Sequence, residues 1–159
     1  MTDRDPQHQA ARAILADARR VAVFTGAGIS ADAGMSTYRG ADGLWEGELV
    51  EKVAFPEGFA ADPAGVWAWY NRLRAKVGEC SPAAGHVALA RLEAKLSALG
   101  GSLTICTQNI DGLHALAGNT RILELHGSLL RARCCECDYH AEIGCEAMDP
   151  LPPRCPACG

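Results

Sequence analysis

The run Val21-Ala-Val-Phe-Thr25 leads directly into Gly26-Ala27-Gly28-Ile29-Ser30-Ala31, and this junction decides the fold. A short apolar run of this kind predicts a buried strand. The residues after it fit the pattern G-x-G-x-x-[G/A], which follows a strand and opens a helix. Glycines there let the backbone approach a pyrophosphate, and a helix N-terminus adds N–H donors and a positive dipole. The junction therefore favours a dinucleotide site over a plain strand–helix turn.

Elements of both kinds are expected on either side of this junction. Further strands are predicted at residues 103–107 and 121–125, with a long loop at 35–60. Helices are predicted from Pro6 to Arg20, after Asp62-Pro63, from Ser81 to Gly100, and briefly before Gly118-Asn119. Strands that alternate with helices predict an α/β fold with a parallel sheet.

Composition excludes several classes of protein. The chain has 159 residues, 48% of them hydrophobic, which argues against disorder. Its net charge of −4, without a long basic run, argues against direct nucleic-acid binding. No apolar stretch approaches the ~18 residues that span a bilayer, and the polar N-terminus does not resemble a signal peptide. We therefore expect a cytoplasmic protein without membrane partners, whose thiols stay reduced.

The chain has 8 cysteines, and four of them have the spacing of a metal site. Cys134-x2-Cys137 and Cys155-x2-Cys158 are separated by 17 residues, a spacer typical of structural zinc modules. Four thiolates leave no open coordination position, so a structural Zn²⁺ is expected rather than a catalytic one. Cys135 is a rival ligand with poorer spacing. Cys145 stands alone between the pairs, and Cys80 and Cys106 are expected to be ordinary buried thiols.

Polar residues follow the two later strands. Gln108-Asn109-Ile110-Asp111 comes after one, and His126-Gly127 after the other. Open α/β sheets bind ligands at the carboxyl ends of their strands, and a histidine there suits a general base. For a lone histidine a loop-capping role is the commoner explanation, and we assign His86 and His114 to that class.

One feature argues against a hydride-transferring dehydrogenase. The Rossmann pattern requires a second strand soon after the first helix, ending in an acidic ribose ligand. Residues 36–45 resemble a loop instead, which could close over a ligand with Arg39 available for phosphate.

Taken together, these residues resemble the sirtuin family of NAD-dependent protein-lysine deacylases. The resemblance rests on residues 26–34, on Thr37-Tyr38-Arg39-Gly40, on residues 107–114, on Leu125-His126-Gly127 and on the two cysteine pairs. These motifs occur in the family's order from about residue 21 to the end of the chain. Residues 42–46 and 55–59 are most similar to bacterial sirtuins of the desuccinylase-like class.

The resemblance implies a role for each matching residue. NAD would be held by Gly26, Ala27, Gly28, Ala31, Tyr38, Arg39, Gln108, Asn109, Ile110 and Asp111; Asn109, Asp111 and His126 would be catalytic; Cys134, Cys137, Cys155 and Cys158 would hold zinc. In the family's reaction the acyl-lysine oxygen attacks the nicotinamide ribose and expels nicotinamide. His126 would then help to deprotonate a ribose hydroxyl, and the products would be free lysine and O-acyl-ADP-ribose. Placing the acyl oxygen against the sugar carbon is the larger part of this catalysis.

The sequence departs from the family in three places. Met35-Ser36 stands where the family has an aliphatic residue and proline, which loosens that loop. Desuccinylase-like members carry Tyr-x-x-Arg for an acidic acyl group; here Tyr70 is followed by Leu73, although Arg74 lies on the same helix face. Arg74 could replace the missing arginine, or be solvated in an enzyme that prefers acetyl groups.

The third departure is the end of the chain at Gly159. The fold implied is a Rossmann-like parallel sheet represented by its first half, at residues 1–132, with a helical segment inserted at about 45–100 and a zinc module at 133–159. We expect a truncated form with weak or no activity. NAD-dependent ADP-ribosyl transfer and a non-catalytic zinc interaction module remain alternatives.

Overall fold

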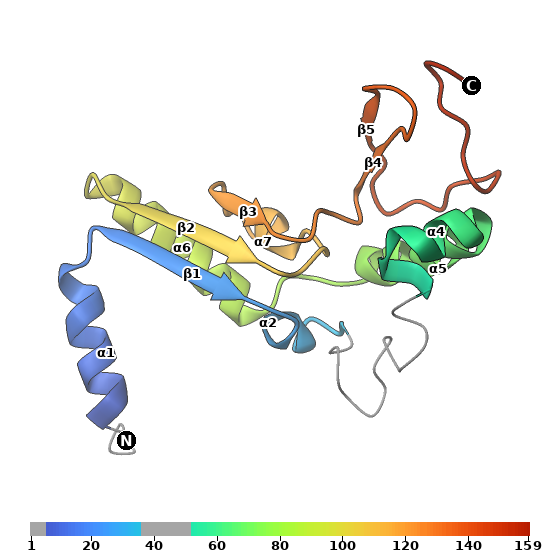
Figure 1. The fold of residues 1–159 in the computed structure, drawn as a ribbon. Helices are drawn as coiled ribbons and strands as arrows, with labels where there is room; N and C mark the ends of the chain where they lie inside the picture. The colour runs from blue at the N-terminus through green and yellow to red at the C-terminus, as the bar shows by residue number, and fades with distance from the viewer. Residues whose placement is uncertain (1–5, 36–51) are drawn as a thin grey trace.

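The computed structural model describes residues 6–35 and 52–159, and its centre is a small parallel sheet. Strand β1 (Arg20–Thr25) pairs along its whole length with β2 (Ser102–Thr107), and β2 pairs with β3 (Ile122–Glu124), giving the order β1-β2-β3 (Figure 1). The three predicted strands and their parallel arrangement are thus confirmed. The carboxyl ends of all three strands lie at one edge of the sheet.

Helix α6 (Ala84–Ala98) covers one face of this sheet. Leu96 packs there against Leu103 and Ile105, which are both fully buried on β2. The helix begins at Ala84 rather than at Ser81, because the N–H of Ala83 is bound by the ring of His86 one turn into the helix. It ends where Gly100 adopts a positive φ of 71°, a conformation that favours glycine.

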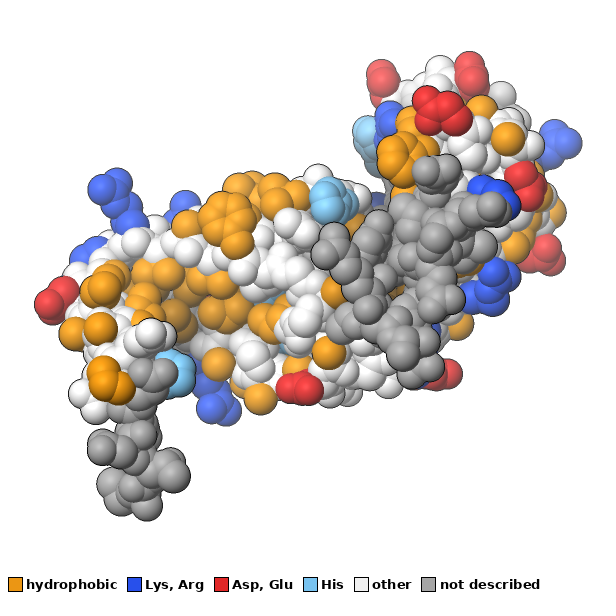
Figure 2. Space-filling view, turned by 60° about the horizontal axis from the view of Figure 1, so that its bottom comes forward, with side chains coloured by type: hydrophobic (Ala, Val, Ile, Leu, Met, Phe, Trp, Pro, Cys, Tyr) orange, Lys and Arg blue, Asp and Glu red, His pale blue; other side chains and the backbone are white. Residues whose placement is uncertain are grey.

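The outer strands are not buried, which corrects the expectation for residues 21–25. Phe24 of β1 is 77% exposed and Leu123 of β3 is 55% exposed. In register these two side chains flank Cys106 on the sheet face opposite α6. Figure 2 shows hydrophobic side chains gathered on the half of the molecule that carries the sheet. Only the central strand has the burial that its apolar sequence predicts.

A helical unit lies beyond the strand ends (Figure 1). Helix α5 (Pro63–Gly78) starts as predicted, since the carboxylate of Asp62 accepts the N–H of Gly65. Its buried side chains Val66, Trp69 and Leu73 form a second core with Val53 and Leu129. Helix α4 (Pro56–Ala61) precedes it, so the predicted loop at 35–60 is wrong for its last residues.

The remaining elements are short or peripheral. Helix α1 (Pro6–Asp17) forms where predicted but buries no residue, and Ile14 is 75% exposed. Helices α2 (Gly28–Ala31) and α7 (Leu113–Leu116) each have one turn, and strands β4 (Arg131–Arg133) and β5 (His140–Glu142) pair antiparallel. Within the described part of the chain, no helix is both long and apolar enough to cross a membrane.

Glu93 of α6 holds the turn that leads into β3. Its buried carboxylate accepts the Asn119 amide at 2.9 Å, the Thr120 hydroxyl at 2.6 Å and the backbone N–H of Thr120 and Arg121. Burial raises the pKa of Glu93, but these hydrogen bonds outweigh it and the pKa is lowered overall. The ionised carboxylate is therefore what stabilises this turn.

We expect Glu93→Gln to lower the free energy of unfolding by about 2 kcal/mol at pH 7, because an amide cannot accept all these donors. Since the folded pKa lies below the unfolded value of about 4.3, this stabilisation is full above pH 5 and is lost as pH falls through the folded pKa. Urea unfolding at pH 7 and at about pH 3 measures it. Glu79→Gln, a change at a 74% exposed side chain, is the control. An equal loss at both pH values would contradict this account.

Candidate functional site

The candidate site is built at the carboxyl ends of the three parallel strands. Gly26 follows β1, residues 108–111 follow β2, and His126 follows β3. Backbone hydrogen bonds hold these loops in place: the Gln108 N–H donates to Thr25, and the Leu125 N–H donates to Thr107. These bonds place the segments that follow neighbouring strands side by side. Tyr38 and Arg39 lie outside the described residues.

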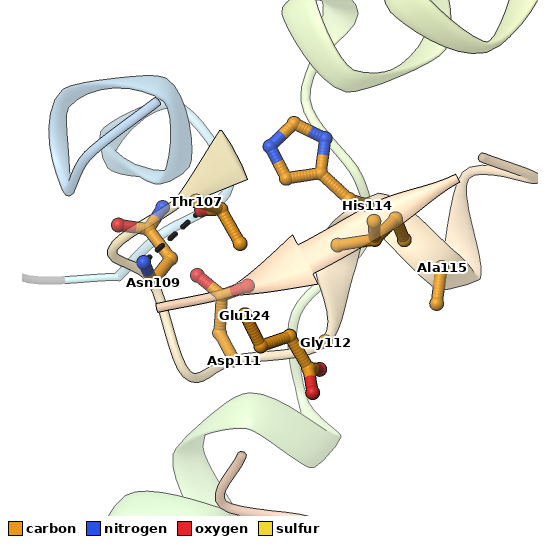
Figure 3. Close-up of a pocket in the computed structure, with 8 residues that line it drawn as sticks. Thr107, Asn109, Asp111, Gly112, His114, Ala115 and Glu124 are labelled. Carbon is orange, nitrogen blue, oxygen red and sulfur yellow. Dashed lines mark hydrogen bonds between the residues drawn. The ribbon is translucent and has the colours of Figure 1, made fainter. Parts of the chain in front are cut away.

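Asn109 joins the loop after β2 to the glycine-rich loop. Its side-chain amide donates to the Gly26 carbonyl at 3.1 Å and to the Ser30 hydroxyl at 3.0 Å. Its backbone N–H donates to the Thr107 hydroxyl at 3.0 Å, as Figure 3 shows. Asn109 is therefore fixed by three hydrogen bonds, and its position is coupled to that of the glycine-rich loop.

Ser30 and Asp111 form the buried floor of the site. The Ser30 hydroxyl donates to Asp111 at 2.7 Å, and the other carboxylate oxygen of Asp111 accepts the Leu113 N–H at 2.9 Å. His86 lies 3.4 Å from the same hydroxyl. Because its Nδ1 accepts the N–H of Ala83, its Nε2 carries the proton and points at Ser30. Burial lowers the pKa of His86, which favours this neutral form.

Sequence reasoning gives His86, His114 and Ser30 no place in the site. His86 does cap the start of α6, but its ring also lies 4.7 Å from that of His114, and both rings are buried against the site. Ser30 occupies a variable position of the glycine pattern. No pattern in the sequence indicates these three residues, because the contacts of Ser30 with His86, Asn109 and Asp111 arise only in the folded chain.

His126 is exposed, and one of its ring nitrogens is held by the loop after β2. Its Nδ1 lies 3.1 Å from the backbone carbonyl of Gln108. A carbonyl can only accept, so Nδ1 carries the proton and Nε2 has a free lone pair. Nε2 is therefore available as a base beside the loop that carries Asn109 and Asp111.

The glycine-rich loop leaves open space. A Cβ built at Gly28 meets no described atom within 4 Å, and one at Gly26 meets only the Gln108 side chain at 4.0 Å. Packing of the described residues therefore does not explain these glycines, whereas close approach of a ligand would. Helix α2 is a single turn, so its dipole adds little to anion binding. Ala27 and Ala31 bracket this turn, and Ile110 packs against the core beside α5.

Tyr70 and Arg74 belong to α5, and Tyr70 packs against the same core as Ile110. Tyr70 is half-buried beside Trp69, and burial raises its pKa. Arg74 is buried, with its guanidinium 5.3 Å from the centre of the Trp67 ring and donating to Asn71. Asn71 in turn holds Met148 through both of its backbone polar groups. Arg74 thus faces the zinc module, and its role toward an acyl group stays a prediction.

The four predicted zinc ligands meet in a cluster. The sulfurs of Cys134, Cys137, Cys155 and Cys158 all lie within 4.8 Å of one another. Cys134 and Cys158 are 3.6 Å apart and Cys137 and Cys155 are 3.7 Å apart, close to the ~3.8 Å edge of a tetrahedron with 2.3 Å Zn–S bonds. The N–H groups of Glu136 and Cys137 lower the pKa of Cys134 to about 6. The cluster suits Zn²⁺, and Cys135 and Cys145 lie outside it.

The family of this chain follows from a comparison of its sequence with models of known protein families. The model of the Sir2 family matches residues 26–159, which include the glycine-rich loop, the strand-end residues and the cysteine cluster. The chain belongs to the Sir2 family. The sirtuin resemblance is therefore confirmed, with its Rossmann-like α/β fold.

Curated relatives support the same assignment. An NAD-dependent protein deacylase of Thermus thermophilus is 52% identical over 149 residues, covering 94% of this chain and 58% of the relative. NAD-dependent protein deacylase 2 of Pyrobaculum aerophilum is 46% identical over 146 residues, covering 92% and 57%. The chain thus spans a little over half the length of the relatives it matches.

Solved structures of Sir2 proteins are also similar to this chain. A Sir2 homologue in complex with NAD superposes with a TM-score of 0.82 at 37% identity, covering 99% of this chain and 59% of that one. A Sir2 protein solved with a p53 peptide and NAD gives a TM-score of 0.69 at 27% identity, covering 85% and 51%.

Proposed function

We propose that this Sir2 chain carries the nicotinamide-side half of an NAD-dependent protein-lysine deacylase site. The observation that carries the proposal is the strand-end cluster, in which Asn109, Asp111 and Ser30 are bound together beside the open glycine loop. The names of the relatives support it, since several are NAD-dependent protein deacylases. The substrate class is an acylated lysine side chain of a protein.

Each residue has a task that follows from its chemistry. The bare backbone at Gly26 and Gly28 gives the NAD pyrophosphate room to approach. Asn109, on its fixed loop, faces the nicotinamide-side ribose together with Gln108. Each carboxylate oxygen of Asp111 accepts one hydrogen bond, from Ser30 and from Leu113. The side chain is therefore rigid and orients the nicotinamide amide. Such pre-organisation lowers the cost of aligning the sugar carbon with the acyl oxygen.

His126 would act as the general base. NAD supplies an activated glycosidic bond whose cleavage releases nicotinamide. The free Nε2 of His126 accepts a proton from a ribose hydroxyl, while its Nδ1–H stays bound to the Gln108 carbonyl. The new positive charge on the ring is then stabilised by that carbonyl. The ribose oxygen would then attack the acyl carbon, the lysine amine would leave with that proton, and water would add to the same carbon, so that the acyl group stays as an ester on the ribose and the lysine is free.

Calorimetric titration with NAD tests the binding half of this proposal. We expect NAD-dependent heat with one site per chain, and weaker heat for Asn109→Ala, because this change releases the Gly26 carbonyl and the Ser30 hydroxyl together. Thr104→Val, on β2 before this loop and outside the cluster, is the control. A chain that gives no heat with NAD while it binds zinc would instead be a zinc interaction module. ADP-ribose left on a protein acceptor would indicate ADP-ribosyl transfer.

A further inference from the structure

The loop that carries His126 is tied at two points to the loop that follows β2. Nδ1 of His126 donates to the Gln108 carbonyl at 3.1 Å. Three residues further along the chain, the backbone N–H of Leu129 donates to the Ile110 carbonyl at 2.9 Å. The first tie is made by an exposed side chain, where water competes for the same carbonyl. The place of the ring therefore depends on what holds the rest of its loop.

Leu129 is the buried end of this loop. Its side chain is 4% exposed and belongs to the core that includes Val66, Trp69 and Leu73 of α5. Removing a leucine side chain from water contributes more free energy than an exposed hydrogen bond, which water can replace. The core beside α5 is therefore the stronger anchor of the loop.

Little slack separates this anchor from the histidine. Gly127 turns the chain with a positive φ of 79°, and the Ser128 hydroxyl accepts the N–H of Leu130 at 3.2 Å. Leu130 packs against the same core and lies over Gly112, where an added Cβ would come within 2.7 Å of it. The loop therefore has few ways to move unless its buried end is released.

We propose that Leu129 is a positioning residue for His126: its buried side chain anchors the loop on the core of α5, and this keeps the imidazole on the Gln108 carbonyl with Nε2 free. The role in deacylation rests on the proposed function. The control over the ring does not, because it follows from contacts within the chain. The helical unit of α5 and the candidate base are thereby coupled.

Long-range ¹H–¹⁵N NMR reports the His126 tautomer in the 159-residue chain, at pH 8 where free imidazole is neutral, with His126→Ala to assign the ring. We expect Nδ1–H in the wild type. Leu129→Ala leaves a cavity and frees the loop, so water replaces the carbonyl and the ring shifts toward a mixture of both tautomers. Leu129→Met fills a similar volume and should keep the ring Nδ1–H.

Leu96→Ala is the matched control, because Leu96 is also 4% exposed but belongs to the core between α6 and β2. It should destabilise the chain to a similar degree and leave the ring Nδ1–H. Leu129→Val, a smaller truncation, should shift the ring in the same direction if Leu129→Ala fails to fold. The proposal would be overturned by a wild-type ring that is not Nδ1–H, by a ring unchanged in every folded truncation of Leu129, or by an equal shift in Leu96→Ala.

Turnover of an acetyl-lysine peptide tests the consequence, in this chain completed with the remaining part of the Thermus deacylase. Leu129→Ala should lower kcat about tenfold, a part of the roughly 10²–10⁴-fold that a general base contributes, while KM for NAD stays the same. NAD binding is spared because the strand-end cluster around Ser30 keeps its own hydrogen bonds. Leu129→Met and Leu96→Ala should keep the wild-type kcat.

A normal kcat in Leu129→Ala, or a loss confined to KM, would overturn the positioning role. A completed wild type that does not deacylate would count against the proposed function, and the tautomer of the ring would still decide whether Leu129 anchors it.

Discussion

Cys155→Ser is expected to lose bound zinc and, with it, the fold of residues 133–159. The wild type should hold one Zn²⁺ per chain, because the four sulfurs lie within 4.8 Å of one another and two of their separations match the edge of a tetrahedral zinc site. Little else orders this module: β4 and β5 have three residues each, and Asn71 holds Met148 from outside. Structural zinc contributes roughly 10–16 kcal/mol in small modules, far more than such a hairpin supplies.

Metal analysis and amide exchange of the module measure this effect. Cys135→Ser is a matched control, since it lies beside Cys134 but outside the sulfur cluster. It should keep its zinc and its protected amides. Zinc lost from Cys135→Ser but retained in Cys155→Ser would show that the ligand set is wrong.

His126→Ala is expected to abolish deacylation while the chain still folds and binds NAD. The side chain is exposed and its one described hydrogen bond is to the Gln108 carbonyl, so its removal leaves no buried group unpaired. A general base contributes roughly 10²–10⁴-fold to a rate, and we expect a loss in this range. The proposed catalytic role of this histidine can therefore be tested without loss of the fold.

Turnover of an acetyl-lysine peptide measures the effect, in this chain completed with the remaining part of the Thermus deacylase. His140→Ala removes another exposed histidine, on β5 of the zinc module, and should leave turnover unchanged. Thermal unfolding confirms that both variants fold. Normal deacylation by His126→Ala would remove His126 from the mechanism.

The sequence predicts the centre of this molecule better than its edges. A five-residue apolar run indicates a strand, but its burial depends on neighbours that the run does not encode. Residues 103–107 have a strand on each side and a helix above, so Ile105 is fully buried. Phe24 lies on the face opposite α6 and is 77% exposed, as is Leu123 of the same face at 55%. Ile14 shows the same limit on α1, where helical spacing is present without a partner surface.

The candidate site also has a part that the sequence predicts and a part that it does not. Parallel strands bring their carboxyl ends together, so the proximity of Gly26 and Asn109 follows from strand assignment alone. The metal cluster could be predicted because its four ligands come from two closely spaced cysteine pairs that are visible in the sequence. The buried histidines could not be predicted, since His114 reaches Thr25 only after α7 and α6 pack beside the sheet. The Arg74 guanidinium likewise contacts Trp67 and Asn71, and helical spacing alone does not determine these partners.

The central claim is that these residues serve NAD-dependent removal of acyl groups from lysine. Mass spectrometry of a reaction with NAD and an acetyl-lysine peptide tests it most directly, with the 159-residue chain and with the completed chain side by side. The account predicts that the completed chain releases nicotinamide, O-acetyl-ADP-ribose and deacetylated peptide only when both substrates are present, and that the 159-residue chain does so weakly or not at all. An intact peptide alongside consumed NAD, or ADP-ribose attached to the peptide, would contradict it.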